Sequence, residues 1–426
     1  MELITNLKTS VKQNQVFRAV GVYTSIMFLT KGVSFLLLFI YTNPKFMEPA
    51  ENGLLNLFGG TVIFLTPFLS FGILQSTSTD FYKLKNDEFK HFFTSNLIPP
   101  VVILLLSIVG FTICREYFKT QYGFPYFFAI LIPLVTFLTY INEQLILLIR
   151  MNGELRKFAL TGIMKIVLEF GLSVVLVVFF AMHWEGRLTG IIVSYGLLAI
   201  YAFYYFYKKG YLSGKIFTHY IRSELVYAVP IIIMQISIFV ISTSDKFFLA
   251  HFQTNEVVGI YAIACIFASI ISLLSVAYLN YLGPTVYEEL SKEKPDYTIL
   301  KKNFFNYAKV MVTGTLLVII LIPFVYKYFI NEKYYSAVSY FYLIALGYFI
   351  WTITSFFHTF LLYYKQKRTM LKLALISMTI SILSIYFFTK QLGATGAAGG
   401  IFLSYCITFI LTLLFVRTHI QKLKII

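Results

Sequence analysis

The sequence predicts an all-α integral membrane protein with about twelve transmembrane helices in two six-helix bundles. Composition is the first reason: hydrophobic residues make up 58% of the 426 residues and charged residues only 13%, unlike a soluble domain. Spacing is the second reason, because apolar runs of roughly 20 residues, each long enough to cross a bilayer as a helix, follow one another almost without interruption. A polytopic membrane protein is therefore expected.

Twelve apolar segments are expected to span the membrane, and no connection between them is long enough for a separate domain. The expected spans are 17–41, 54–75, 94–114, 125–149, 158–182, 188–207, 226–250, 257–281, 305–329, 338–363, 370–388 and 394–416. The connection 208–225 is basic, contains glycine and follows the sixth span. It is expected to link an N-terminal bundle, 1–207, to a C-terminal bundle, 226–426. The longest connection, 282–304, has apolar residues at helical spacing among charges, which predicts a short helix on the inner membrane surface.

Internal similarity between the two halves supports the two-bundle interpretation. Each half begins with a basic segment and two spans separated by a short outer turn, which carries Glu51 and Gly53 in one half and Glu256 and Gly259 in the other. An acidic and aromatic stretch follows in each half, beginning at Asp80 in the first and running from Tyr287 to Glu289 in the second. Half-repeats of this kind are a common plan of transporters.

Lysine and arginine are distributed asymmetrically between the two sides of the predicted spans. The connections expected outside hold only Lys45, Arg115, Lys119, Arg187, Lys327, Lys333 and Lys390, and the other connections and both termini hold the remaining basic residues outside the spans. The positive-inside rule therefore predicts that both termini are cytoplasmic. The polar N-terminus shows no cleavable signal peptide, so the first span is expected to remain as a helix. The net charge of +16 follows from this bias, and no nucleic-acid partner is expected.

Motifs of catalysis and cofactor binding are not found in the sequence. It contains no GxxxxGK[ST] phosphate loop and no nucleophile elbow, and its six histidines form no metal-binding pair. Glycines in 393–400 are expected to allow close helix packing. Cys114, Cys265 and Cys406 are interpreted as small buried hydrophobes. We therefore expect no catalytic residues, no cofactor and no metal site, and we predict a transporter rather than an enzyme.

Ionisable residues at membrane depth are the candidates for a transport site, because each such charge costs roughly 2.5–3.5 kcal/mol on insertion scales. Lys31 lies in the middle of the first span without a neighbour of opposite charge, so it requires a partner from another helix or an anionic ligand. Glu143 lies in the inner half of the fourth span. Lys165 and Glu169 share one face of the fifth span and form either a self-neutralised pair or part of a functional site.

Three further segments carry charge within or near the spans. Asp245 and Lys246 are adjacent near the outer end of the seventh span, where an outer gate or a pair that locks the helix is favoured over direct substrate contact. Lys309 and His358 lie near the inner ends of the ninth and tenth spans, from which their side chains can also reach the headgroups.

A longer pattern surrounds Asp245. The segment SDKFFL is followed by a short polar loop and by VGIYAIA, and the matching residues are Ser244, Asp245, Lys246, Phe247, Leu249, Val258, Gly259, Tyr261 and Ala264. This arrangement resembles the seventh and eighth helices of the Wzx-like polysaccharide flippases, a branch of the MATE/MOP exporter superfamily. Similar segments cover nearly the whole chain, including 31–57, 150–159 and 362–400. Asn52-Gly53 replaces the Tyr-Gly that is common in the family.

The resemblance implies a MATE/MOP-like fold and a function. The protein would flip undecaprenyl-pyrophosphate-linked oligosaccharide repeat units across the bacterial cytoplasmic (inner) membrane for O-antigen, capsule or exopolysaccharide synthesis. Transport would proceed by alternating access of two bundles about a central cavity. The implied partners are the lipid-linked oligosaccharide, membrane lipids, and polysaccharide polymerase and assembly proteins.

Residue roles follow from depth and charge under this resemblance. The residues expected to bind the anionic pyrophosphate are Lys31, Lys165 and Lys309. The residues expected to act in ion coupling or gating, with a proton or sodium ion, are Glu143, Glu169, Asp245 and Lys246.

Other functions are weighed against the flippase. A cation-coupled multidrug exporter of the same superfamily would share the fold but would be expected to use acidic residues, whereas the deep unpaired charge of Lys31 is basic. A membrane glycosyltransferase or polymerase usually carries a large external loop, and the outer connections here are short. A lipid II flippase is less favoured because that branch typically has two further spans.

Overall fold

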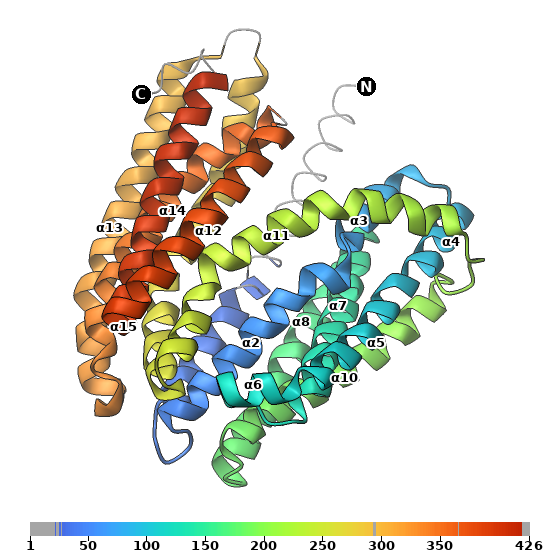
Figure 1. Cartoon of the computed structure of the whole chain (residues 1–426). Helices are drawn as coiled ribbons and strands as arrows, with labels where there is room; N and C mark the ends of the chain where they lie inside the picture. The colour runs from blue at the N-terminus through green and yellow to red at the C-terminus, as the bar shows by residue number, and fades with distance from the viewer. Residues whose placement is uncertain (1–21, 23–24, 27, 293–294, 365, 420–426) are drawn as a thin grey trace. The chain divides into compact units, whose positions relative to one another are not determined.

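The computed structural model describes residue 22 and residues 25–26, 28–292, 295–364 and 366–419. Nearly all of these residues lie in helices, and the described part of the chain contains no β-strand (Figure 1). The all-α prediction is confirmed. The two chain ends and most of the N-terminal part of the first predicted span lie outside the described residues, so the orientation of the termini stays a prediction.

The helices follow one another with short connections. They are the apolar helix Phe28–Tyr41, α2 (Pro49–Ser70), α3 (Ile73–Lys83), α4 (Asn86–Asn96), α5 (Ile98–Ile113), α6 (Arg115–Tyr122), α7 (Phe128–Met151), α8 (Leu155–Ile166), the π-helix η1 (Val167–Gly171), α9 (Leu172–Val174), the π-helix η2 (Val175–Phe179), α10 (His183–Lys208), α11 (Thr218–Phe252), α12 (Asn255–Ser291), α13 (Tyr297–Phe329), the 3₁₀ turn η3 (Glu332–Tyr334), α14 (Ala337–Tyr363) and α15 (Lys367–His419).

Ten helical segments among the described residues are long and apolar enough to cross a membrane. The last of them, α15, is two helices joined at Gly393, whose φ of 58° and ψ of −132° are not helical. It therefore accounts for the last two predicted spans, and Phe28–Tyr41 accounts for the described part of the first. The expectation of a surface helix over 282–304 is wrong, because α12 continues through Ser291 and α13 begins at Tyr297.

The chain forms two compact units. The first contains the chain up to Met47 together with Thr61–Arg115 and Tyr126–Val229. The second contains Glu48–Gly60, Glu116–Pro125 and the chain from Pro230 onward. Helices α2 and α11 therefore contribute to both units. The division into 1–207, 208–225 and 226–426 stays a prediction.

Aromatic side chains fill the core of the first unit where α4, α7 and α10 pack together. The ring of Phe93 on α4 lies 5.1 Å from that of Phe206 on α10, and Phe89 lies 5.5 Å from Tyr211. The start of α4 is fixed locally, because Glu88 accepts a hydrogen bond of 3.1 Å from the backbone N–H of Lys85.

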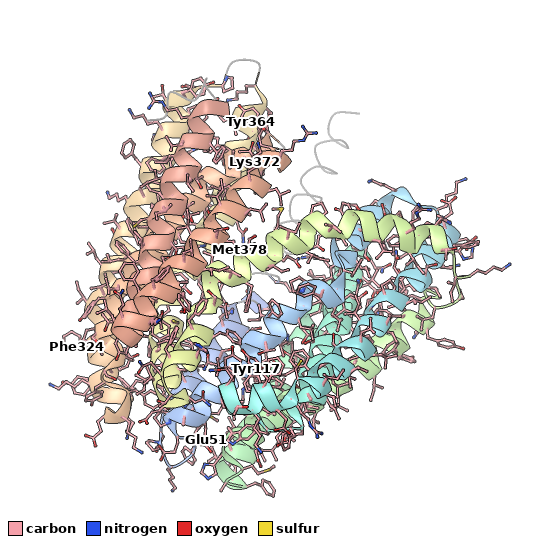
Figure 2. All side chains as sticks on the ribbon, in the orientation of Figure 1. Glu51, Tyr117, Phe324, Tyr364, Lys372 and Met378 are labelled. Atoms are coloured by element: carbon pink, nitrogen blue, oxygen red, sulfur yellow. The ribbon has the colours of Figure 1, made fainter. Side chains whose placement is uncertain are left out.

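The second unit is built on α12, α13, α14 and α15, which pack side by side (Figure 1). Tyr307 on α13 is buried among them and donates a hydrogen bond of 2.7 Å to the carbonyl of Thr352 on α14, while the Ser275 hydroxyl on α12 lies 2.7 Å from the same phenol oxygen. On the outer face of α13 large apolar side chains remain exposed, including Phe324 at 57% (Figure 2). Such a face is suited to lipid rather than water.

Candidate functional site

An ion pair in the first unit joins the fifth predicted span to α10. Arg187 Nη2 on α10 lies 2.8 Å from Oε1 of Glu169 on η1, and the two side chains are only 16% and 8% exposed. The other guanidinium nitrogen, Nη1, donates a hydrogen bond of 3.0 Å to the hydroxyl of Ser173. Both charges are therefore compensated inside the helix bundle.

Close packing of the two helical segments brings this pair together. A Cβ built on Gly190 of α10 would lie 2.9 Å from the backbone nitrogen of Ser173, and one on Gly186 would lie 3.0 Å from the carbonyl carbon of Leu176. Only glycine permits this approach of the backbones. The fifth span also contains π-helical turns at η1 and η2, a feature that is frequent at functional sites.

Aromatic rings surround the guanidinium of Arg187. Its Cζ atom lies 5.1 Å from the ring centre of Phe170 and 5.8 Å from that of Tyr41. Both distances fall within the range of cation–π attraction. These rings stabilise the positive charge and hold the guanidinium in a fixed orientation beside Glu169.

Lys165 on α8 has a different environment. Its ammonium lies 4.9 Å from the ring centre of Tyr195 on α10, and it is electrostatically coupled to the exposed Glu143 on α7. The interpretation of Lys165 and Glu169 as a self-neutralised pair is wrong, because Glu169 pairs with Arg187. Lys165 is therefore a half-buried cation without a carboxylate within ion-pair distance in the described structure.

Arg187 is a residue of this site that the sequence pattern does not indicate. It was assigned to an outer connection because it immediately precedes the sixth predicted span. In the structure α10 begins earlier, at His183, and Arg187 lies within its second turn. The nearby Gly186 and Gly190 were the available signal, since two glycines four residues apart on a helix indicate close packing.

Asp245 in the second unit is completely buried on α11, next to the half-buried Lys246. The thiol of Cys265 on α12 lies 4.0 Å from Oδ2 of Asp245. The hydroxyl of the buried Tyr261 lies within hydrogen-bonding reach of the Asp245 carboxylate, but neither this hydroxyl nor Oδ1 makes a hydrogen bond of normal geometry within the described residues. Asp245 and Lys246 are electrostatically coupled, but no ion pair joins them in the described structure, and their role in gating or ion coupling stays a prediction.

The other residues of the SDKFFL and VGIYAIA pattern serve mainly in packing. Leu249, Val258 and Ala264 are fully buried. The ring of Phe247 lies 5.9 Å from that of Tyr122, and the hydroxyl of Ser244 donates to the carbonyl of Val240 at 2.6 Å. Most residues of the pattern therefore serve in packing within the second unit.

The remaining predicted charges are separate from these groups. Lys31, on the helix Phe28–Tyr41, and Lys309, on α13, have exposed side chains, and neither forms an ion pair in the part of the chain that the structure describes. His358 lies 3.4 Å from the hydroxyl of Thr412. Their roles in transport stay predictions.

The described residues contain neither a candidate metal site nor a disulfide bond. No group of three or more histidine, cysteine, aspartate or glutamate side chains there could hold a metal ion. The cysteines are unpaired, and Cys114, which was expected to be buried, is exposed.

Solved structures with a similar fold are membrane transporters. An inward-facing multidrug resistance MATE family transporter of the MOP superfamily gives a TM-score of 0.72 at 13% identity over 95% of this chain and 99% of that chain. The lipid II flippase MurJ, in an inward closed conformation, gives 0.68 at 13% identity over 93% and 87%. The MATE multidrug transporter DinF-BH gives 0.63 at 15% identity over 92% of each chain. The predicted MATE/MOP-like fold is confirmed.

Sequence comparison supplies the family. No curated protein matches the chain. Residues 16–288, well over half of the chain, match the family described as polysaccharide biosynthesis protein. The chain is thus a multi-pass membrane protein that belongs to the polysaccharide biosynthesis protein family.

Proposed function

We propose that the protein flips undecaprenyl-pyrophosphate-linked oligosaccharide repeat units across the bacterial cytoplasmic membrane by alternating access, for the assembly of a surface polysaccharide. The observation that carries this proposal is the match of residues 16–288 to a polysaccharide biosynthesis family in a chain with a transporter fold. The similarity of fold to MurJ, named as a lipid II flippase, adds support because lipid II is itself a lipid-linked saccharide.

Lys165 is the strongest candidate for contact with the pyrophosphate. Its ammonium lies over the Tyr195 ring and within the first unit, where low dielectric strengthens its attraction to an anion. Arg187, by contrast, is already neutralised by Glu169. Lys31 and Lys309 complete the proposed set of substrate contacts. Lys31 is an exposed cation on the apolar helix Phe28–Tyr41, and Lys309 is an exposed cation on α13, which is long enough to span a membrane.

Glu169 and Arg187 offer a route from ion binding to substrate binding. If a proton or sodium ion neutralises Glu169, the guanidinium loses its counter-charge and becomes available for phosphate, for which its planar fork is well suited. Glu143, Asp245 and Lys246 are the other proposed coupling or gating groups. Asp245 can accept a further bond through Oδ1, which has no partner in the described structure.

A cation-coupled multidrug exporter is the second candidate, because the fold is also that of MATE multidrug transporters. The two functions differ in the charge of the substrate. A lipid pyrophosphate requires cationic contacts such as Lys165, whereas a cationic drug requires acidic ones.

Deletion of the gene in its native host tests the proposal. Surface glycan and lipid-linked repeat units in each leaflet would be measured after complementation with the wild type, Lys165→Ala or, as a control, Lys302→Ala on an exposed position of α13. A flippase predicts loss of surface glycan with complete repeat units retained in the cytoplasmic leaflet, restored by the wild type and Lys302→Ala.

Two outcomes would contradict the flippase. Repeat units that reach the outer leaflet but are not polymerised would indicate a polymerase. Unchanged glycan with new sensitivity to cationic drugs would indicate the multidrug exporter.

A further inference from the structure

Glu224 is a buried carboxylate without a compensating side chain. It lies in the second turn of α11 within the first unit and is 4% exposed. Its Oε2 atom has no hydrogen-bond partner, and no ion pair involves it, within the described residues. A buried carboxylate is costly unless it is paired, so Glu224 requires a proton or a bound cation.

Polar side chains of two other helices interact with Glu224. On α3, the hydroxyl of Ser76 lies within hydrogen-bonding reach of the carboxylate, and Asp80 is electrostatically coupled to it. On α7, Tyr140 is also coupled to Glu224, and its hydroxyl accepts a hydrogen bond of 3.3 Å from Nε2 of Gln144. The carbonyl oxygen Oε1 of Gln144 is then left buried and without a partner in the described structure.

Nearby cations do not neutralise this cluster. Lys83 Nζ lies 4.0 Å from Asp80 Oδ1, but its side chain is 71% exposed and extends toward solvent. Arg222, on the same helix as Glu224, is also exposed. Burial raises the pKa of Asp80 above its ordinary value despite the attraction of Lys83. The negative charge of Glu224 and Asp80 is therefore not balanced by a buried positive charge in this cluster.

Two other acids of the first unit, the buried Glu169 and the partly exposed Glu154, are neutralised by basic side chains. Glu169 pairs with Arg187 at 2.8 Å, and Glu154 pairs with Lys209 at 2.7 Å. Glu224 interacts instead with the hydroxyl-bearing Ser76 and Tyr140 and with the acidic Asp80. A set of oxygen donors with no nitrogen or sulfur is the type that hard cations prefer.

We propose that Glu224, together with Ser76 and Asp80, forms a binding site for one dehydrated monovalent cation of the size of Na⁺. A single charge is inferred because Glu224 supplies one deeply buried negative charge, while Asp80 is partly exposed and lies near Lys83. The site belongs to the end of the first unit that the sequence predicts to face the cytoplasm. It shares no residue with the Glu169–Arg187 pair and does not rest on the proposed glycan substrate.

Thermal unfolding of the purified full chain in nanodiscs tests this site. The melting temperature would be measured with NaCl, KCl or choline chloride at constant ionic strength and mildly alkaline pH. A ligand that binds only the folded state raises this temperature in a saturable manner. We expect such a rise with Na⁺ for the wild type, its loss in Glu224→Gln, and a several-fold higher Na⁺ requirement in Ser76→Ala.

Glu185→Gln is the matched control, because Glu185 is an exposed acid of the same unit. It should retain the full response to Na⁺. If Glu224→Gln does not fold, Ser76→Ala, which removes only one hydroxyl, still provides the test. An unchanged response in the variant that folds would overturn the site. A wild type that responds equally to K⁺, or only to pH and not to Na⁺, would overturn the assignment to Na⁺; in the second case a proton would be the ligand.

Discussion

Gly53 on α2 packs against Gly259 on α12, and the two backbones leave no room for a methyl group between them. A Cβ on Gly53 would lie 3.0 Å from the nitrogen of Gly259 and would also collide with the carbonyl of Asn255, while a Cβ on Gly259 would lie 2.9 Å from the nitrogen of Gly53. Both residues belong to the second unit. The turn elements that the sequence repeats in its two halves are therefore packed directly on one another.

Alanine at either crossing glycine should destabilise the second unit. Gly53→Ala and Gly259→Ala both force the helices apart, and overpacking of this kind costs about 1–3 kcal/mol. Gly59→Ala on the same helix α2 is the control, because a Cβ there meets nothing within 4 Å. Thermal unfolding in detergent should show lower melting temperatures for the first two variants and an equal or higher one for the control. Equal temperatures for all three would contradict the close crossing.

The spans were predictable from the sequence because membrane thickness sets their length. The described part of each predicted span is largely helical, and an apolar run of this length can be recognised without knowing which helices pack against it. The ends were less predictable. α11 begins at Thr218, so Glu224, which composition places in the linker 208–225, lies inside a helix and is buried.

Contacts between helices were not predictable in the same way. Lys165 and Glu169 lie four residues apart, which is the spacing of an ion pair on a regular α-helix. The π-helical turn at η1 and the close approach at Gly190 instead bring Arg187 to Glu169. Helix rotation depends on packing across the bundle, and the order of residues along one span does not contain that information. Asp245 and Lys246 were identified together because they are adjacent in the chain.

The Glu169–Arg187 pair should show strong coupling in a double-mutant cycle. Arg187→Gln leaves Glu169 buried without its cation, and breaking a buried pair in this way costs about 3–5 kcal/mol. The double variant Glu169→Gln/Arg187→Gln should recover much of that loss, because neither charge remains. Unfolding by denaturant measures the four free energies.

The pair of Asp87 and Lys90 is the control for this cycle. The Lys90 Nζ and Asp87 Oδ1 atoms are 2.8 Å apart, but Asp87 is exposed, so solvent screening should make their coupling much weaker than that of Glu169 and Arg187. Purely additive effects at Glu169 and Arg187 would show that the buried pair is not coupled.

Lys165→Ala should impair transport more than stability. Loss of a hydrogen bond to a charged group costs about 1.5–3 kcal/mol, which corresponds to roughly a tenfold or greater loss of affinity for the pyrophosphate. The decrease in the free energy of unfolding should be smaller, because the contact that Lys165 makes with Tyr195 is a cation–π interaction. Export of lipid-linked repeat units and the melting temperature would be measured on the same variants. Lys302→Ala should leave both unchanged, and normal export by Lys165→Ala would exclude this residue as a substrate contact.

Glu154 should make the first unit sensitive to acid. It follows α7 and receives three polar contacts: Lys209 Nζ at 2.7 Å, Lys157 Nζ at 3.0 Å and the hydroxyl of Tyr205, which donates at 3.0 Å. Burial alone would raise the pKa of Glu154, but these hydrogen bonds and charges outweigh it and hold the pKa below the ordinary value of 4.5. The folded state therefore favours the ionised carboxylate more than the unfolded state does.

The sign of the pH effect follows from this depressed pKa. The stabilisation is fully present above about the ordinary value of 4.5 and is lost as the pH falls through the folded-state pKa below it. Glu154→Gln should lower the melting temperature at neutral pH and flatten its decline in acid. The exposed Glu185→Gln should keep the wild-type slope, because no ion pair of Glu185 is present in the described structure. Parallel acid profiles for the wild type and Glu154→Gln would mean that the contacts of Glu154 contribute nothing to folding, and the acid sensitivity would then originate elsewhere in the chain.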